Sequence, residues 1–246
     1  MKEWITGRNP VIEVLQAKRR QVFRLLFASG IEEKDKIVEM RRLAQARKIP
    51  IEMVPRDNLN KLAENPQGVA LEVSAYPYMD ISDILENAKE REEELFVLVL
   101  DVIQNPQNLG TLLRTAEAAG IHGVIIPQHR SAEVTPAVVT ASAGASEHMI
   151  IAQANIARTL EDLKKKDVWV VGLEGGEGAK PVEDVPLSGP LALVVGNEGE
   201  GMRALVRETC DYLMALPMRG HIESLNAAVA GSIAIYLSLL QRSKPK

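Results

Sequence analysis

The amino-acid sequence predicts an α/β protein in which a small α/β domain precedes a larger domain built on a parallel sheet. In the second part of the chain, continuous apolar runs of strand length alternate with helix-length stretches, which is typical of a parallel sheet covered on both faces. The first part holds shorter strand and helix patterns. The charge also changes sign, from a net +4 over residues 1–75 to a net −8 over residues 76–246.

The predicted N-terminal domain spans residues 1–75. Its expected elements are three short strands, 22–29, 49–55 and 68–74, and one helix, 34–48. Its basic residues include Lys18, Arg19, Arg20, Arg24, Arg41, Arg42, Arg47 and Lys48. Each of these residues is explained about equally well by a position on a solvated surface and by a role in ligand binding. The net positive charge of the set, however, predicts a surface for an anionic polymer.

Residues 80–94 mark the expected boundary between the domains. They contain seven acids and two bases, with little apolar content after Leu85. Such a composition is typical of a solvated helix or a linker. We therefore expect an acidic linker over residues 76–94.

The second domain is expected over residues 95–246. Its predicted strands are the apolar runs 95–101, 124–127, 168–173 and 191–196, with a further strand in the run beginning at Tyr212. Its predicted helices are 109–120, 135–145, 155–166 and 224–242, and the last is the longest apolar helix. Ligand sites in parallel α/β sheets usually lie at the carboxyl ends of strands, so the loops at those ends are expected to carry the functional site.

The loop after the first of these strands contains Asn105, Pro106 and Asn108. Turn chemistry and a helix N-cap at Asn108 explain the asparagines. They do not explain Arg114, which follows nearly two turns into the predicted helix. An arginine beside a helix N-terminus favours an anion site, although a surface or structural role is also open.

Two glycine-rich loops, 172–178 and 196–201, resemble phosphate-binding loops but match neither the dinucleotide fingerprint nor the P-loop. Their glutamates would repel phosphate, so a neutral or cationic ligand is expected there. Glu198 is equally explained as a loop acid bound to backbone N–H groups. In the last loop, Ser224 and Asn226 are explained by helix capping.

Composition excludes several other classes of protein. A formal charge of −4 excludes a globally basic coat protein for nucleic acid. The single cysteine, Cys210, leaves no room for an internal disulfide or a cysteine-based zinc site, and the histidines lack metal-ligand spacing, so no metal is expected. No run approaches ~18 apolar residues and the N-terminus is too polar for a signal peptide, so we expect a soluble, cytoplasmic protein without membrane contact.

The three loops, taken together, carry a resemblance to a known family. The patterns N-P-x-N-x-G-x-x-x-R-x-A, G-N-E-G-x-G-M and L-P-M-x-G-x-x-x-S-L-N follow three strands in that order. They closely resemble the motifs of the SpoU/TrmH (SPOUT) family of SAM-dependent RNA ribose 2′-O-methyltransferases, over residues 95–240. Residues 7–17 and 65–73 resemble the edges of that family's RNA-binding domain, which is similar to ribosomal protein L30e. Within the family, chain length and domain pairing most resemble the 23S rRNA guanosine enzymes.

The resemblance implies a fold and a site that the spacing alone does not show. It implies a C-terminal trefoil knot that holds S-adenosyl-L-methionine (SAM), and a homodimer with active sites at the subunit interface. SAM would rest on backbone around Gly196, Leu216 and Leu225, with Met218 nearby. The catalytic residues carried over from the motifs are Asn108, Arg114, Glu198, Ser224 and Asn226.

The resemblance also assigns roles. Asn108 and Ser224 would orient the ribose and phosphate, Glu198 would fix Arg114 or a loop, and Asn226 would support the SAM loop. Arg114 is described in the family as the base that activates the 2′-hydroxyl. Guanidinium groups hold their proton in nearly every protein setting, so a clamp on phosphate and developing alkoxide stays open as the alternative. Asn105 departs from the family's usual Asp, which keeps the turn and removes a charge.

Three alternatives to a 23S rRNA methyltransferase stay open. The motifs do not separate it from a tRNA ribose methyltransferase of the same family. A non-catalytic RNA-binding or assembly protein could keep the same fold, although the presence of all five polar positions argues against it. An NAD dehydrogenase is more remote, because the dinucleotide fingerprint is absent.

Overall fold

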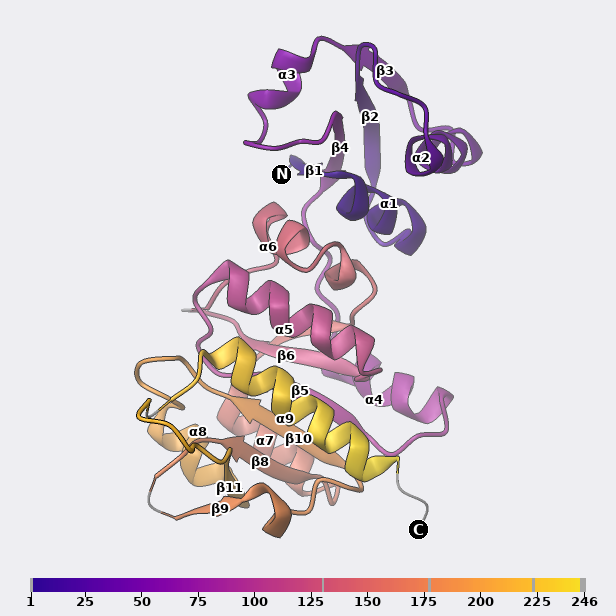
Figure 1. Ribbon diagram of the computed structural model, residues 1–246. Helices are drawn as coiled ribbons and strands as arrows, with labels where there is room; N and C mark the ends of the chain where they lie inside the picture. The colour runs from indigo at the N-terminus through magenta and orange to yellow at the C-terminus, as the bar shows by residue number, and fades with distance from the viewer. Residues whose placement is uncertain (1, 130, 177, 223, 244–246) are drawn as a thin grey trace. The chain divides into compact units, whose positions relative to one another are not determined.

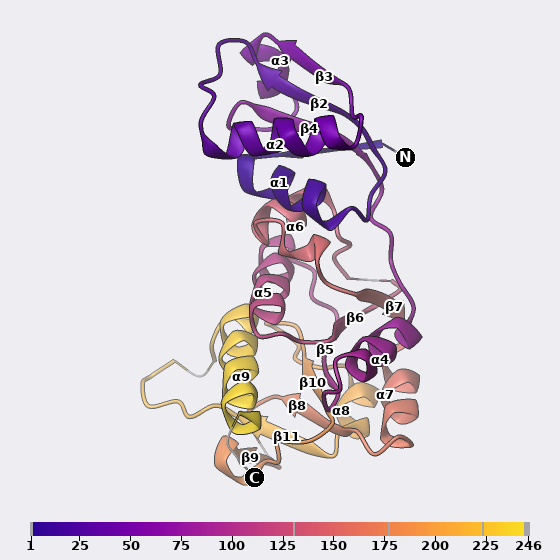
Figure 2. The same cartoon turned by 90° about the vertical axis from the view of Figure 1, so that its right-hand side faces the viewer.

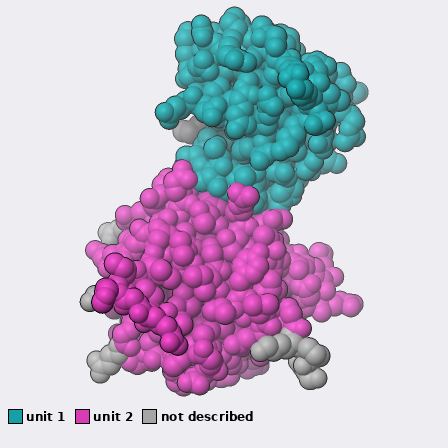
Figure 3. Space-filling view, viewed as in Figure 1, with its two compact units in different colours: residues 1–77, 133–148 teal, residues 78–132, 149–246 magenta. Residues whose placement is uncertain are grey.

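The chain passes three times between two structural units. In the computed structural model, which describes residues 2–129, 131–176, 178–222 and 224–243, unit 1 contains residues 1–77 and 133–148 (Figure 3). Unit 2 contains residues 78–132 and 149–246. Residues 133–148, which were expected in the second domain, group with unit 1. The first unit is therefore discontinuous in sequence.

Unit 1 is built on a four-stranded sheet of order β1-β4-β2-β3. Its strands are β1 (Lys2–Thr6), β2 (Val22–Ala28), β3 (Ile51–Val54) and β4 (Val69–Ser74). Its helices are α1 (Arg8–Ala17), α2 (Asp35–Ala46), α3 (Arg56–Asn60) and α6 (Pro136–Ala141), followed by a 3-10 turn, Ala145–Glu147. α1 and α2 lie side by side on one face of the sheet and α3 lies on the other (Figures 1 and 2). The predicted strands and helix of this part are present, whereas β1, α1 and α3 were not predicted.

A buried ion pair ties residues 133–148 into unit 1. The Arg20 side chain is fully buried, and its guanidinium donates to both carboxylate oxygens of Glu147, at 2.9 and 3.0 Å. It also donates to Glu3 Oε2 at 2.7 Å and to the Ser74 carbonyl at 3.1 Å. Removing one partner of such a pair costs about 3–5 kcal/mol, because the other charge is left uncompensated. Residues 133–148 are therefore an integral part of this unit.

Unit 2 contains a parallel sheet of seven strands among the described residues, in the order β7-β6-β5-β10-β8-β11-β9. The strands are β5 (Phe96–Leu100), β6 (Gly123–Pro127), β7 (Ile151–Ala154), β8 (Trp169–Leu173), β9 (Ala179–Pro181), β10 (Leu191–Val195) and β11 (Tyr212–Ala215). Every residue of β5, β6 and β10 is buried, as their apolar runs predict. The expected parallel α/β fold is confirmed, and β7 and β9 are additions to it.

Helices cover both faces of this sheet. They are α4 (Ile81–Glu90), α5 (Pro106–Ala118), α7 (Ile156–Lys164), α8 (Ala204–Thr209) and α9 (Ala227–Arg242), and a 3-10 turn spans Val182–Asp184. α5 and α9 pack together on one face, whereas α4, α7 and α8 lie on the other (Figures 1 and 2). The helix expected over 135–145 is shorter, as α6, and belongs to unit 1. None of the helices within the described ranges is long and apolar enough to cross a membrane.

Residues 80–94, whose acidic composition predicted a solvated helix or a linker, contain the helix α4. Asp80 and Asp83 form a reciprocal capping box at the start of α4. Ile84 and Ala88 are buried in the same core as β5 and α7. The apolar residues of α4 recur at helical spacing, so this helix covers the sheet with one face and exposes its acids on the other.

Candidate functional site

Loops from the carboxyl ends of β5, β10 and β11 are joined by hydrogen bonds at Glu198. Its Oε1 accepts from Asn108 Nδ2 at 2.7 Å and from the Ala227 backbone N–H at 3.3 Å. It also accepts from Asn226 Nδ2, which donates to Asn108 Oδ1 at 3.2 Å as well. One residue from each of the three sequence motifs therefore contributes to a single polar cluster, Asn108–Glu198–Asn226.

Helix capping orients the two asparagines of this cluster. Asn226 is the N-cap of α9, where its Oδ1 accepts from the Ala228 and Val229 N–H groups at 3.0 and 3.1 Å. Its Nδ2 is thereby directed to Glu198. The N-cap of α5 is Asn105, whose Oδ1 accepts from Gln107 N at 2.8 Å, and not Asn108 as the capping interpretation expected.

Glu198 is placed favourably for a carboxylate. It lies at the N-terminus of α9, a helix of 16 residues whose unpaired N–H groups carry partial positive charge. Asn108 lies inside the first turn of α5, so its side chain is free to donate to this carboxylate. Glu198 therefore fixes two loops to a helix end, which is the second of the two roles expected for it.

Arg114 does not join this cluster within one chain. Its side chain is exposed on α5, and no hydrogen bond or ion pair to it occurs within the part of the chain that the structure describes. No contact between Glu198 and Arg114 occurs among the described residues, so the role of Glu198 in fixing Arg114 stays a prediction. The guanidinium donors are therefore unpaired as far as the described residues extend.

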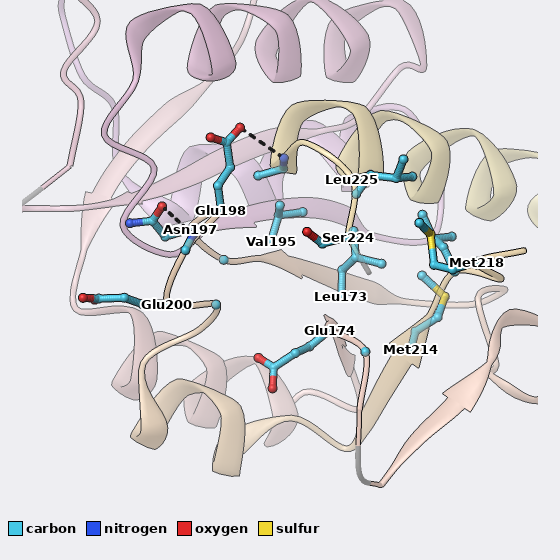
Figure 4. A pocket seen from close by; sticks show the side chains of 17 residues that line it. Leu173, Glu174, Val195, Asn197, Glu198, Glu200, Met214, Met218, Ser224 and Leu225 are labelled. Carbon is cyan, nitrogen blue, oxygen red and sulfur yellow. Dashed lines mark hydrogen bonds between the residues drawn. The ribbon is translucent and has the colours of Figure 1, made fainter. Parts of the chain in front are cut away.

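A cavity of about 380 Å³ lies beside the cluster (Figure 4). Its apolar lining comes from Leu173, Val195, Met214, Leu216, Met218 and Leu225, and its polar lining includes Glu174, Asn197, Glu198, Glu200 and Ser224. The residues predicted to hold a cofactor, Gly196, Leu216, Met218 and Leu225, all line it. Asn108, Arg114 and Asn226 do not line it.

The wall of the cavity at Gly196 is made by close backbone approach. A Cβ at this position would lie 2.5 Å from the Gly201 carbonyl carbon and 2.6 Å from Met202 N. Asn197 and Gly201 exchange two backbone hydrogen bonds, at 3.0 and 3.1 Å, which close a tight turn. Gly201 has φ +68°, a conformation that glycine adopts most readily. The glycines of this motif therefore serve the shape of the loop.

The charge of the cavity is acidic. Glu174, Glu198 and Glu200 line it, and no lysine or arginine is among the described residues that do. Three carboxylates beside apolar side chains favour a ligand that carries positive charge and apolar groups. This agrees with the sequence-based expectation of a neutral or cationic ligand.

Glu174 was not predicted as a site residue. It comes from the loop 172–178, whose residue 177 lies outside the described residues. The resemblance of that loop to 196–201 was a signal, but the sequence does not show that β8 and β10 are neighbours. Pairing of β8 with β10 brings the two loops to one cavity.

His122 and Cys210 of unit 2 have structural surroundings. His122 is buried, its Nδ1 accepts from Phe96 N at 3.0 Å, and burial lowers its pKa. Burial raises the pKa of the Cys210 thiol to about 12, so it is not a nucleophile at neutral pH. Across the described ranges, no three His, Cys, Asp or Glu side chains gather in a way that could hold a metal ion.

Comparison with known proteins identifies the family. A sequence profile described as the SpoU rRNA Methylase family matches residues 95–236. The chain belongs to the SpoU rRNA methylase family. A second profile, described as RNA 2'-O ribose methyltransferase substrate binding, matches residues 4–79. This SpoU-family protein is therefore an RNA methyltransferase with a substrate-binding domain at its N-terminal end.

Two similar bacterial proteins extend over nearly the whole SpoU-family chain. A putative TrmH family tRNA/rRNA methyltransferase, YacO, from Bacillus subtilis (strain 168) is 40% identical over 236 residues, covering 95% of this chain and 94% of its own. A putative TrmH family tRNA/rRNA methyltransferase from Staphylococcus aureus (strain COL) is 41% identical over 234 residues, covering 94% of this chain and 93% of its own.

Solved structures show the same SpoU fold. The SpoU methyltransferase AviRb from Streptomyces viridochromogenes, crystallised with AdoMet, is 23% identical and superposes with a TM-score of 0.80, over 98% of this chain and 90% of its own. An AdoMet-bound rRNA methyltransferase from Sinorhizobium meliloti is 23% identical, with a TM-score of 0.78 over 98% of this chain and 87% of its own.

Gly196→Ala is expected to destabilise unit 2. The added Cβ meets backbone atoms that cannot move away like a flexible side chain, so overpacking should lower the free energy of unfolding by about 1–3 kcal/mol. Gly199→Ala is the matched control, because a Cβ there has open space. Urea unfolding of both variants measures the difference. Equal stability of the two variants would contradict the close approach described for Gly196.

Proposed function

We propose that this protein transfers a methyl group from S-adenosyl-L-methionine to a ribose 2′-hydroxyl of RNA. The observation that carries the proposal is the acidic, apolar cavity beside the Asn108–Glu198–Asn226 cluster. The cluster contains one residue from each of the three sequence motifs. The match of residues 4–79 to a substrate-binding profile for ribose 2′-O-methyltransferases supports ribose as the acceptor.

The residues of the cavity fit S-adenosyl-L-methionine. Leu173, Leu216 and Leu225 offer an apolar surface for adenine, and the Gly196 backbone leaves room for close approach. Carboxylates nearby suit a cationic sulfonium. When bound, the cofactor would supply a methyl group on a positively charged sulfur. Transfer of that methyl group leaves the sulfur neutral. AviRb and the Sinorhizobium meliloti enzyme were crystallised with this cofactor, which supports the assignment.

The polar residues prepare the acceptor. Glu198 holds Asn108 and Asn226 in one place, and Ser224 lies at the cavity wall, so amide and hydroxyl groups orient the ribose and phosphate of RNA. Arg114 acts on the reacting oxygen in one of two ways. In one, Arg114 in its neutral form accepts the 2′-hydroxyl proton. In the other, it stays protonated and stabilises the phosphate and the developing alkoxide, and the 2′-hydroxyl proton passes to solvent water. The permanent charge of guanidinium favours the second.

A homodimer would bring Arg114 to a site, because within one chain it stands apart from the cluster. α9 carries an apolar stripe, Val229, Ile233, Tyr236 and Leu240, whose side chains are 40–61% exposed. Their spacing places them on one face of the helix. An exposed stripe of this kind is typical of a covered interface. We propose that a second copy covers it and that its Arg114 completes the site.

The trefoil knot remains part of the proposal. α9 follows β11 but packs beside α5, over the central strand β10: a Cβ at Gly231 would lie 2.6 Å from Leu112 and 3.3 Å from Val195. Such a path supports the knotted topology that the family resemblance implies.

The RNA substrate is proposed to be 23S rRNA, with guanosine as the methylated nucleotide, as in the enzyme RlmB. The protein is proposed to act in the cytoplasm.

In unit 1, Arg20, Arg24 and Arg41 are paired with carboxylates. Lys18 and Arg47 end α1 and α2, which pack together, and no carboxylate partner of either occurs among the described residues. These ends of α1 and α2 are the proposed phosphate-binding surface.

The first test is incubation of the protein with methyl-labelled S-adenosyl-L-methionine and total RNA. Label is expected in 23S rRNA, and mapping should place it on a ribose 2′-oxygen of one guanosine. Label confined to tRNA would instead support a tRNA methyltransferase of the same family. Label in no RNA, with RNA binding intact, would support a non-catalytic RNA-binding protein.

Arg114→Ala is expected to lower kcat by about 10²–10³-fold, the usual loss when a preorganised donor to the transition state is removed. Arg114→Lys keeps the charge but loses the planar fork, so it should recover only part of the rate. Arg158→Ala, an exposed arginine of α7 on the other face of the sheet, is the control and should be unchanged. Single-turnover methylation measures all three. Full activity of Arg114→Lys would contradict fork-dependent positioning.

Ile233→Glu is expected to convert a dimer into a monomer, because it places a charge in the apolar stripe of α9. Val38→Glu, at an exposed apolar position of α2, is the control. Sedimentation velocity at micromolar concentration measures both.

Mixing equal amounts of Arg114→Ala and Glu198→Ala should restore about a quarter of the wild-type sites. Random exchange of subunits makes about half of the dimers mixed, and each mixed dimer has one of its two sites with both residues intact. A monomeric wild type, or a mixture without activity, would contradict the shared site.

A further inference from the structure

The loop that follows β10 is held from both sides by acid–arginine pairs. We call residues 196–203 the donor loop, because it forms the Gly196 wall of the cavity and carries Glu198. β10 lies between β5 and β8 in the sheet. Asp101 comes directly after β5 and Glu174 directly after β8, and each binds the segment that leaves β10. Neither residue belongs to the sites assigned above as catalytic.

Asp101 holds the end of the donor loop. Its side chain is fully buried. Oδ2 accepts from the Arg203 backbone N–H at 2.8 Å, and Oδ1 accepts from Arg203 Nε at 2.8 Å. Arg203 Nη2 lies 2.6 Å from the same Oδ1 as an ion pair. A buried carboxylate needs compensating donors, and all of the donors found for it in the described residues come from Arg203. The pair therefore fixes both the backbone and the side chain of this residue.

Glu174 holds the same segment from the other side. Its Oε1 accepts from Arg207 Nε at 2.7 Å, and its Oε2 accepts from the Met202 N–H at 3.4 Å. The added Cβ of an alanine at Gly201 would lie 3.1 Å from Glu174 Oε2, so this carboxylate packs directly on the turn. Glu174 thereby contacts the donor loop as well as the cavity.

The donor loop needs such support because its own sequence is permissive. Gly196, Gly199 and Gly201 fix few backbone angles, and glycine loses the most conformational entropy on ordering. Within the loop, the turn is closed by the two hydrogen bonds between Asn197 and Gly201. Opening the turn would move the Gly196 wall and the Glu198 carboxylate together. The shape of the cavity therefore depends on what holds residues 202 and 203.

We propose that Asp101 and Glu174 are positioning residues that, through Arg203 and Arg207, hold the donor loop closed in the form that receives the methyl donor. The proposal rests on the function proposed above and deepens it. Neither carboxylate takes part in methyl transfer. Their effect falls on the affinity for the donor, because a loop that is open part of the time lowers the fraction of protein competent to bind.

Asp101→Asn tests the proposal in the full-length protein. It keeps an oxygen for the Arg203 N–H and removes the charge that holds the guanidinium. The dissociation constants of S-adenosyl-L-methionine and S-adenosylhomocysteine, measured by titration calorimetry without RNA, should rise by at least about tenfold. The KM for the donor should rise in parallel, whereas kcat at saturating donor should stay within about threefold, because the bound state restores the loop.

Asp211→Asn is the matched control for a merely structural effect. Asp211 also combines a backbone donor and a cation: Oδ2 accepts from Val170 N at 2.9 Å and Oδ1 pairs with Lys164 Nζ at 2.7 Å. It lies at the amino end of β11, away from the cavity. Both Asp211→Asn and Asp101→Asn should lower the stability of the protein to urea. In Asp211→Asn, however, the dissociation constant of the donor should stay within about twofold of wild type.

Arg203→Met and Arg203→Lys keep the test decisive if Asp101→Asn does not fold. The Arg203 side chain is half exposed, and its backbone N–H still reaches Asp101 in both variants. Arg203→Met should weaken donor binding and Arg203→Lys should restore part of it. Unchanged affinity in folded Asp101→Asn and Arg203→Met, or an equal loss in Asp211→Asn, would overturn the positioning role alone. Absence of donor binding by the wild type would overturn the proposed function and this role together.

Discussion

One carboxylate oxygen, Glu198 Oε1, joins the parts of the candidate site. Its partners Asn108 and Asn226 lie 90 and 28 residues away in the sequence. Because the oxygen sits at the start of α9, the helix end, the turn after β10 and the start of α5 are placed by the same interaction. The cavity wall then follows from the turn, so the chemistry of the site depends on a contact that no single motif could make.

The sequence was sufficient for the elements with a strong local signal. The apolar runs of β5 and β10 are strands buried on both faces, and the long apolar pattern after Asn226 is α9. Short or edge elements such as β1 and β9 lacked that signal. Residues 133–148 were expected with the second domain but group with unit 1 in the structure. The sequence could not show this, because the interaction that holds them there, Arg20 with Glu147, spans 127 positions of sequence. Such pairings leave no local pattern.

The candidate site shows the same division. Asn108, Glu198 and Asn226, one from each motif, meet in one cluster, whereas Arg114 stands apart from it among the described residues. Gly196, Leu216, Met218, Ser224 and Leu225 line one cavity. Glu174 and Asp101 were missed, because their importance comes from the order of strands in the sheet, with β10 between β5 and β8. The sequence predicted Asn108 as the N-cap of α5, whereas the N-cap is Asn105, about one turn earlier. That difference matters, since it leaves Asn108 free to bind Glu198.

The discontinuity of unit 1 changes what a domain means in this chain. Since residues 133–148 leave the β6–β7 connection of unit 2 to complete unit 1, a single proteolytic cut near residue 77 would not release an intact unit 1. It would leave Glu147 attached to unit 2, without the buried arginine that compensates its charge. A transplant of unit 1 of this protein into another chain therefore has to carry two segments, residues 1–77 and residues 133–148.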